Sequence, residues 1–522
     1  MGFLLAIPLV ILYNIKSLKG ICMSFIFNGI RIRKNLTKAQ RDALVEDRYQ
    51  RTDPNTGITS VFRRVTYYDP KLQFNVYVAQ QKVGVQDPQT NTVVPVRSKK
   101  TGSKRRAVDI AVTDALTQAS DDLTDNRQTG KVLYGLPPFM EILLCCALGG
   151  DFAPKNAASY WGRHLAFFRK RWGTELPEIA PSISTVNRLL RLIEPSELTT
   201  LYQNLVFPLL PQPNQKNVDK DIVAVDGQKI RASRNESGEQ HQFLSFYSTE
   251  AGIAFAQALI DRKSNEIPAA LELVKVLDLR GTIVTGDAMH CQRKFVKTLM
   301  NESRADYCLA VKQNQGTLAQ EIELCFGKTA VEFHYETEGV AHGRRERRLI
   351  EVLPGELLPE SLHKTWWGLK YGCIVRQTSW RTEIRAGGKE EPTTEKVRYF
   401  ISSLSPHEPE IARQLLRAVR SHWQIENHLH YILDVDFGQD RTQMRNANLI
   451  ENTAQINKLA MAIIELTRRQ QNKERKTSRL ISFNEIRSGV QNNPQQAIEF
   501  IDNFLRQSDA GKMNREDEPL IH

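Results

Sequence analysis

The stretch DIVAVDGQKI, residues 221–230, predicts a β-strand that delivers a carboxylate, Asp226, to the rim of a sheet. Its apolar residues follow one another without alternation, as in a strand covered on both faces. The stretch TIVTGDAM at 282–289 repeats the pattern and ends in Asp287. Either aspartate alone would be interpreted as a turn or cap residue. Two of them on separate strands of one sheet predict a ligand site at its edge.

The segments around these two strands alternate between strand and helix patterns. Strands are predicted at 241–249, 253–263 and 306–312, and helices at 265–279 and 291–302. Three strands, a helix, a strand, a helix and a strand indicate an α/β protein with a mixed sheet. A long helix is expected after Ser405-Pro406, and it carries Glu426.

The chain has 522 residues, which is enough for two to four domains. Changes in composition and turn signals predict the following divisions: an apolar leader at 1–22, a polar region with strands at 23–130, a helical domain at 131–215, an α/β region at 216–325 that continues at 405–470, a strand-rich region at 326–404, and a basic, polar, mostly exposed tail at 471–522.

The charge and the cysteines suggest a partner and a compartment. A net charge of +12 makes an acidic polymer a plausible partner, although charge alone does not establish one. The seven cysteines form no CxxC pair, which favours a reduced, cytoplasmic setting. The apolar run at 3–13 is shorter than the ~20 residues of a membrane span and contains Pro8. We expect it to precede a start at Met23; a membrane anchor is the alternative.

Two carboxylates at one sheet edge repel each other unless a cation lies between them. Oxygen ligands without cysteine or histidine favour Mg²⁺ or Mn²⁺. Two such ions about 3.5–4 Å apart would clamp a phosphodiester. Because two aspartates supply too few ligands, a third carboxylate is needed. We predict Glu426, in VRSHWQIENHLHYILDV at 419–435.

Other interpretations of Glu426 stay open at this stage. On a helix it would share a face with His422 and His430, an arrangement that a zinc ion could use, although the HExxH order is missing. It could instead pair with Arg420 or Arg445 in a purely structural role. The carboxylates that compete for its place are Asp434, Asp436 and Glu451.

Six ordered blocks between about residues 136 and 466 resemble the DDE-type insertion-sequence transposases of the H-repeat-associated group. The blocks include VAVDGQKIRAS, the segment from QALIDRKSNEIPAA to VTGDAMHCQ, ADYCLAVKQNQGTL, HGRRERR, RYFISSL and RSHWQIENHLHYILDV. The resemblance implies that 216–325 and 405–470 form a ribonuclease-H-like catalytic core and that 326–404 form a β-rich insertion within it. Asp226, Asp287 and Glu426 fall on the three catalytic, metal-binding acids of that family, and the segment with PPFMEILLCCAL resembles its small N-terminal helical domain.

Two departures from related groups concern the surroundings of the glutamate. Related DDE groups place a tyrosine, an arginine and a lysine at set offsets, where this chain has Val419, His422 and Leu433. The segment MRNAN at 444–448 lacks a glycine that the block would contain. These departures put the role of His422 as a phosphate partner in question.

Basic residues in several blocks are candidates for DNA contact. Arg344 and Arg348, with Arg345 and Arg347, alternate along a predicted strand and place cations on both faces. The remaining candidates are Lys312, His422, Arg188 and Arg191, the last two on a predicted helix that either reads DNA or packs a core.

We therefore expect the protein to be an enzyme, a DNA transposase that uses Mg²⁺ or Mn²⁺ and no small-molecule cofactor. Its predicted partner is double-stranded DNA, both element ends and target, on which it would act as a homo-oligomer associated with a bacterial nucleoid. The alternatives are a structure-specific nuclease on the same core and a DNA-binding remnant that has lost catalysis.

Overall fold

Between residues 1 and 122, the computed structural model describes only the backbone of six strands. It describes residues 123–516 apart from short gaps at 126, 128–131, 151, 212–219, 234–239, 261–264, 342, 386–389, 443 and 476–478. The chain divides into two compact units, Ser17–Ala111 and the remainder. The predicted leader lies outside the described residues. Within the described part, no helix has the length and apolar character needed to cross a membrane.

The unit Ser17–Ala111 is built from strands. A four-stranded antiparallel sheet contains β3 (Leu44–Thr52), β4 (Thr59–Asp69), β5 (Phe74–Gln86) and β6 (Val93–Pro95). The short strands β1 (Phe25–Phe27) and β2 (Ile30–Ile32) form a separate pair. These strands confirm the prediction of strands in the polar region at 23–130.

The larger unit contains the predicted alternation of strands and helices, which confirms a mixed α/β fold. In chain order the elements are β7 (Asp221–Lys229), β8 (Gln242–Ser248), β9 (Ile253–Leu259), α7 (Glu266–Val274), β10 (Thr282–Gly286), α8 (Arg293–Asn301) and β11 (Asp306–Val311). Strand β10 pairs in parallel with both β7 and β11, while β7, β8 and β9 are antiparallel. The apolar residues of β7 and β10 are buried, as their unbroken runs predicted.

The strands between residues 326 and 404 continue the same sheet. After α9 (Gly316–Lys328) come β12 (Phe333–Ala341), β13 (Arg344–Pro354), the short α10 (Glu360–His363), β14 (Cys373–Glu383) and β15 (Thr394–Ser402). Because β15 pairs antiparallel with β11, the nine strands run in the order β12-β13-β14-β15-β11-β10-β7-β8-β9. The boundaries proposed for an insertion therefore mark no break in the sheet.

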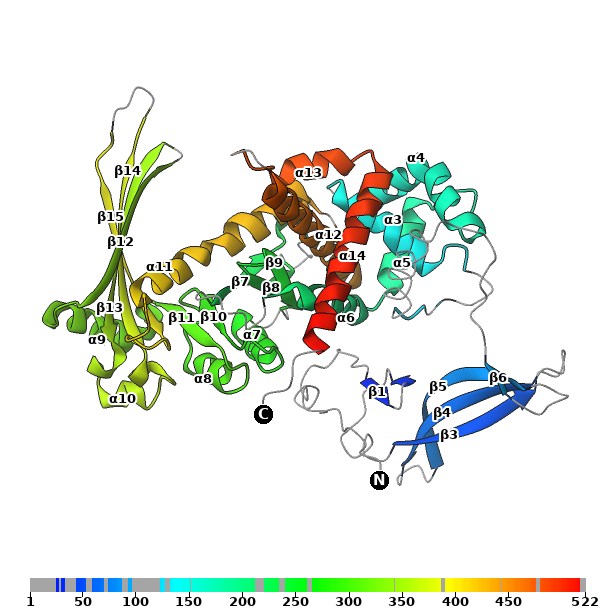
Figure 1. Cartoon of the computed structure of the whole chain (residues 1–522), viewed down its shortest axis with the longest axis horizontal. Helices are drawn as coiled ribbons and strands as arrows, with labels where there is room; N and C mark the ends of the chain where they lie inside the picture. The colour runs from blue at the N-terminus through cyan, green and yellow to red at the C-terminus, as the bar shows by residue number, and fades with distance from the viewer. Residues whose placement is uncertain are drawn as a thin grey trace. The chain divides into compact units, whose positions relative to one another are not determined.

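Helix α11 (Ile411–Ser421) covers one face of this sheet (Figure 1). Its buried residues Leu415 and Val419 pack against Ile350, Val375 and Phe400 of the neighbouring strands. The strands β12 to β15 extend well beyond the helix, as Figure 1 shows. Where α11 no longer covers the sheet, the side chains on the same face change from apolar to charged, as from Ile350 to Arg348 on β13.

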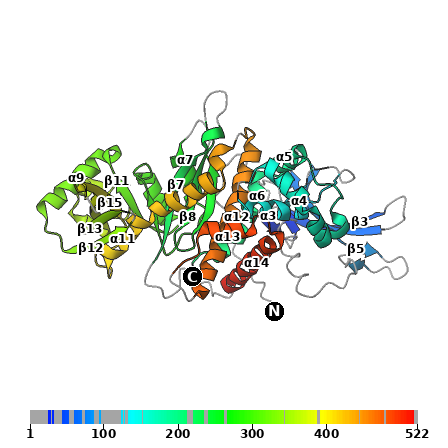
Figure 2. The ribbon, with the colours of Figure 1, turned by 90° about the horizontal axis from the view of Figure 1, so that it is seen from above.

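Helices α3 (Leu136–Leu148), α5 (Ile183–Leu192) and α6 (Pro195–Val206) pack on α12 (Ala447–Glu474), and α4 (Pro154–Trp172) packs on α3 and α5. Figure 2 shows α3, α5 and α6 grouped around α12. The three predicted helices are present, and Ser182 caps α5 by accepting a hydrogen bond from Thr185 N at 3.2 Å. Since these helices share a continuous apolar core with α12, the structure gives no independent support for a separate helical domain.

The tail after residue 470, expected to be mostly exposed, is folded in the described residues and buries part of its side chains. The tail forms α13 (Phe483–Val490) and α14 (Pro494–Glu516), and Ile498, Ile501 and Phe504 are buried. The apolar residues recur three positions apart and therefore form a stripe on one face of the helix. The overall composition of the tail is polar and does not reveal this stripe.

Candidate active site

Asp226 and Asp287 lie at neighbouring positions in two parallel strands. The register pairs Val225 of β7 with Gly286 of β10, so the aspartates are the next residues on each strand. Asp226 is still inside β7, and the Asp-Gly pair is therefore no turn. Asp287 follows β10 and accepts a hydrogen bond from Met289 N at 2.9 Å, which combines a turn role with its position at the sheet edge.

Glu426 lies in a π-helical turn and not in the long α-helix that was expected. Helix α11 ends at Ser421, and two π-helical segments follow, η9 (Ile425–His430) and η10 (Ile432–Asp436). The wider turns carry Glu426 to the mouth of a cavity, where its side chain is exposed. Such local π-helical geometry is rare and is concentrated at functional sites.

A cavity of about 710 Å³ brings together four of the residues predicted from the sequence. Its lining contains Asp287, Glu426, His422 and Lys312. Asp226 is not part of this lining, and its Oδ2 atom lies 3.6 Å from His430 Nδ1. The cavity thus joins two of the three candidate acids with the cations Lys312, Lys396 and Arg398, and the third acid lies on the adjacent strand.

The candidate acids influence one another electrostatically. Burial, together with the negative charges of Glu266 and Glu426, raises the pKa of Asp226 to about 7. Partial loss of contact with water at the cavity raises the pKa of Glu426, with Asp287 adding to the effect and Arg398 opposing it. Carboxylates that disfavour one another's ionisation form a site in which a cation would be stabilised.

The two histidines beside the acids are held neutral. Burial lowers the pKa of His422 to about 4 and that of His430 to about 3. His422 Nδ1 lies 3.3 Å from Thr285 Oγ1 on β10. As a contact for DNA, His422 would therefore act as a neutral hydrogen-bonding group at pH 7 and not as a cation.

The described residues contain no group of three His, Cys, Asp or Glu side chains placed to hold a metal ion, so neither the zinc set with His422 and His430 nor the three acids forms a closed site. The chemistry of Asp226, Asp287 and Glu426 nevertheless fits a hard divalent cation, since all supply carboxylate oxygens. Their mutual effect on pKa is the observation that supports this fit.

The structure places the carboxylates that compete with Glu426 in other surroundings, and it does not pair Glu426 with the arginines proposed as its partners. Asp434 accepts a hydrogen bond from Gln228 at 2.7 Å, and Asp436 pairs with Arg487 at 3.3 Å. Glu451 lies on α12, and burial raises its pKa to about 7. In the described part of the chain, no ion pair joins Glu426 to the arginines at 420 and 445.

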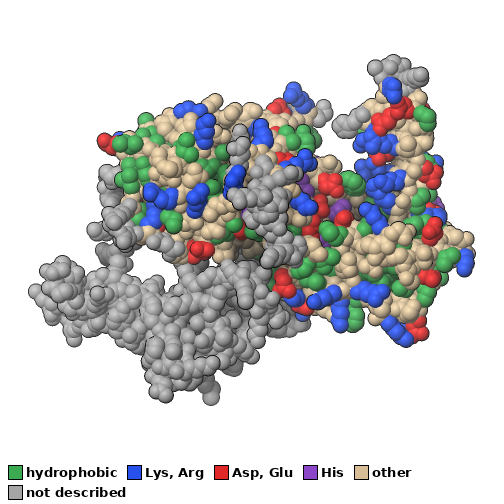
Figure 3. Space-filling model, turned by 180° about the vertical axis from the view of Figure 1, so that it is seen from behind, with side chains coloured by type: hydrophobic (Ala, Val, Ile, Leu, Met, Phe, Trp, Pro, Cys, Tyr) green, Lys and Arg blue, Asp and Glu red, His purple; other side chains and the backbone are tan. Residues whose placement is uncertain are grey.

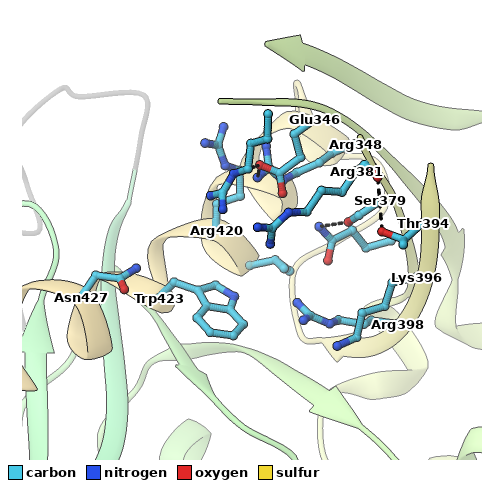
Figure 4. Close-up of a pocket in the computed structure, with 13 residues that line it drawn as sticks. Glu346, Arg348, Ser379, Arg381, Thr394, Lys396, Arg398, Arg420, Trp423 and Asn427 are labelled. Atoms are coloured by element: carbon cyan, nitrogen blue, oxygen red, sulfur yellow. Dashed lines mark hydrogen bonds and ion pairs between the residues drawn. The ribbon is translucent and has the colours of Figure 1, made fainter. Parts of the chain in front are cut away.

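A second cavity, of about 620 Å³, opens between α11 and the projecting ends of β13, β14 and β15; we call it the cationic groove (Figure 4). Six cationic side chains line it together with one carboxylate, Glu346: Arg344, Arg348, Arg381, Lys396, Arg398 and Arg420. Figure 3 shows Lys and Arg gathered on these strands. Burial lowers the pKa of Arg348, Glu346 opposes this, and Arg420 and Arg344 lower it further, as expected where cations crowd without enough anions.

Sequence reasoning found Arg344 and Arg348 but missed the other four cations of the groove. Lys396 and Arg398 are two residues apart in a strand, so a period of two already placed them on one face. Their alignment with Arg348 depends on pairing between strands and was not available from the sequence. Arg188 and Arg191 lie on the exposed side of α5 and line neither cavity.

A family model described as "Transposase DDE domain" matches residues 217–463, which include the three candidate acids. The "H repeat-associated putative transposase YhhI" of Escherichia coli (strain K12) is 31% identical over 350 residues, covering 66% of this chain and 88% of that protein. The "Putative transposase YncI" of Escherichia coli O157:H7 is 31% identical over 355 residues, covering 66% and 85%. The chain therefore belongs to the DDE transposases of the H-repeat-associated group.

Proposed function

We propose that this protein is a DNA transposase that cuts the ends of its element by metal-assisted hydrolysis and joins the freed 3′ hydroxyl to target DNA. Membership of the family implies DNA as the partner and, in general, a divalent metal ion. The observation that carries the proposal is the pairing of β7 and β10, which puts Asp226 beside Asp287, with Glu426 lining the same cavity as Asp287.

Asp226, Asp287 and Glu426 are the residues that would hold Mg²⁺ or Mn²⁺. The bound ions would supply Lewis acidity, activating the attacking hydroxyl and stabilising the leaving oxygen. The side chains of the protein have the task of binding and orienting the DNA. Lys312 is exposed on the cavity wall, where its ammonium group can meet a phosphate.

The cationic groove leads to this cavity. Lys396, Arg398 and Trp423 line both spaces, so a DNA backbone held in the groove can continue to the acids without leaving a surface of positive charge. The guanidinium of Arg398 lies 5.4 Å from the centre of the Trp423 ring, which holds both side chains at the junction.

A structure-specific nuclease and a remnant without catalysis remain the alternative functions. The nuclease would stop after strand cleavage, whereas a transposase also forms a joined product between element end and target. The remnant would bind element ends without cutting them. Incubating the protein with labelled element ends and a target plasmid separates all three, and action as a homo-oligomer is checked by the mass of the DNA complex.

The decisive variants are Asp226→Asn, Asp287→Asn and Glu426→Gln, which keep size and remove charge. Strand cleavage should fall by several orders of magnitude in each, and combining two should add little, since the site acts as a unit. Binding to DNA ends and the melting temperature should stay close to wild type, because Glu426 is exposed and burial already disfavours the charge of Asp226.

Asp434→Asn is the matched control, since this neighbouring carboxylate binds Gln228 and should be dispensable for cleavage. Cleavage by the wild type should require Mg²⁺ or Mn²⁺ and should not be restored by Zn²⁺ alone. Full activity in EDTA, normal cutting by Glu426→Gln, or unfolding of that variant would each overturn the assignment.

A further inference from the structure

A buried carboxylate and a buried imidazole lie beside the two aspartates and have no part in the site described so far. Glu266, at the start of α7, is 6% exposed, and His290, in the turn after β10, is 1% exposed. Glu266 Oε2 lies 3.2 Å from His290 Nε2. Neither side chain can reach DNA, so any role must act through the neighbouring residues.

Two glycines next to the aspartates make room for this pair. A Cβ atom on Gly227, the residue after Asp226, would lie 2.1 Å from Glu266 Oε1. A Cβ atom on Gly286, the residue before Asp287, would lie 2.9 Å from His290 Cβ. Neither glycine has a positive φ, so what matters is the absent side chain and not the backbone conformation.

The pair is also poorly satisfied by the rest of the fold. Glu266 Oε1 accepts a hydrogen bond from Gln242, but Glu266 Oε2 and both ring nitrogens of His290 are buried without a hydrogen bond of good geometry from any described residue. Buried polar atoms of this kind cost stability. The pair also acts on Asp226 electrostatically. Burial has the largest effect on the pKa of that carboxyl, and in addition Glu266 raises it and His290 lowers it.

We propose that Glu266 and His290 are positioning residues, whose contact locks the two strand ends in the arrangement in which Asp226 and Asp287 bind a divalent cation. The inference rests on the proposed function, because it assumes that the aspartates hold the metal ion. Each member of the pair occupies the space beside one aspartate, and their contact therefore ties one strand end to the other. Groups that orient metal ligands from behind commonly change metal affinity about ten- to a hundredfold when they are replaced.

The test measures binding of Mn²⁺ to the full chain without DNA, by the rise in melting temperature during a titration and by the electron paramagnetic resonance signal of free Mn²⁺. Glu266→Gln and His290→Gln should each raise the half-saturating Mn²⁺ concentration about ten- to a hundredfold. The double variant should be no worse than the more severe single variant, because the two residues act through one contact. Cleavage by both variants should recover at saturating Mn²⁺.

Glu141→Gln is the matched control for a purely structural effect. Glu141 is 1% exposed and pairs with Arg171 at 2.9 Å on the helices α3 and α4. Its replacement should lower the melting temperature and leave the half-saturating Mn²⁺ concentration unchanged. If Glu266→Gln and His290→Gln behave in the same way as this control, the positioning role is overturned.

Asp226→Asn, measured alongside, separates this inference from the proposed function. If Asp226→Asn leaves Mn²⁺ binding unchanged, the proposed metal site itself fails. If it abolishes binding while the Glu266 and His290 variants bind normally, only the positioning role fails. Should Glu266→Gln not fold, Glu266→Asp keeps the charge and withdraws it from His290; raised half-saturation then supports the proposal, and unchanged half-saturation overturns it.

Discussion

Lys458 is a charged residue enclosed almost completely by the protein, at 3% exposure. Its Nζ atom donates a hydrogen bond to Ser245 Oγ at 3.0 Å, and Ser245 stands opposite Asp226 in the pairing of β7 with β8. Burial lowers the pKa of Lys458 to about 7. The folded state therefore disfavours the ammonium form, and stability should depend on pH.

Replacing Lys458 with Met should stabilise the protein by about 1–4 kcal/mol at or below pH 7, since an apolar side chain of similar length removes a buried charge. Between about pH 7 and the ordinary lysine value of 10.5, the unfolded wild type binds more protons than the folded wild type, so its stability rises with pH. The advantage of the variant should therefore shrink through this window. Urea unfolding of both proteins at pH 6, 8 and 10 measures the difference in their free energies of unfolding. A difference that does not change with pH would contradict the lowered pKa of Lys458.

Strand β13 carries cationic side chains on both of its faces. On the face away from the groove, Arg345 pairs with Glu390 at 3.0 Å, and Arg347 pairs with Glu336. On the groove face, Arg344 and Arg348 share the single carboxylate Glu346. The same strand therefore presents paired cations on one face and an excess of cations on the other.

Replacing Arg344 and Arg348 with alanine should weaken DNA binding and reduce the slope of log affinity against log salt by about one to two units. The matched control is the double variant Arg345→Ala and Arg347→Ala, which removes two cations from the opposite face and should leave the slope unchanged. Binding titrations between low and physiological salt measure both. Equal slopes for the two double variants would show that Arg344 and Arg348 are ordinary solvated surface cations without a DNA contact.

At the scale of the whole molecule, the C-terminal helices complete the apolar core of the larger unit. Residues of α13 and α14 belong to the same buried cluster as α3 and α12. Arg487 of α13 also pairs with Asp436, at the end of the π-helical segment that follows Glu426. The tail therefore supports the region that carries the candidate active site.

Removing residues 476–522 should yield insoluble or unfolded protein, because the deletion exposes the apolar side chains that α13 and α14 cover. Phe504→Ala, at a site that is 2% exposed, should cost about 3–5 kcal/mol of stability. Glu499→Ala, on the exposed side of α14, should have little effect. Soluble yield and melting temperature check the three proteins, and a truncated chain that melts like the full one would show that the helices are dispensable.

The sequence by itself determined the parts of this protein that depend on local patterns. Unbroken apolar runs predicted the strands that carry Asp226 and Asp287, and alternating cations predicted that β13 is charged on both faces. The ordered blocks identified the family, and the comparisons confirm it. The catalytic role of Glu426 was also proposed from the sequence, and it stays a prediction until the variants are measured.

Only the tertiary structure decided which distant residues meet. The pairing of β15 with β11, the groove shared by three strands and α11, the contact between Glu266 and His290, and the burial of α14 each join residues far apart along the chain. The π-helical turn at Glu426 differs from an α-helix in hydrogen-bond register, which side-chain periodicity over six residues does not distinguish. Local preference fixes a strand or a helix, whereas long-range packing selects its neighbours.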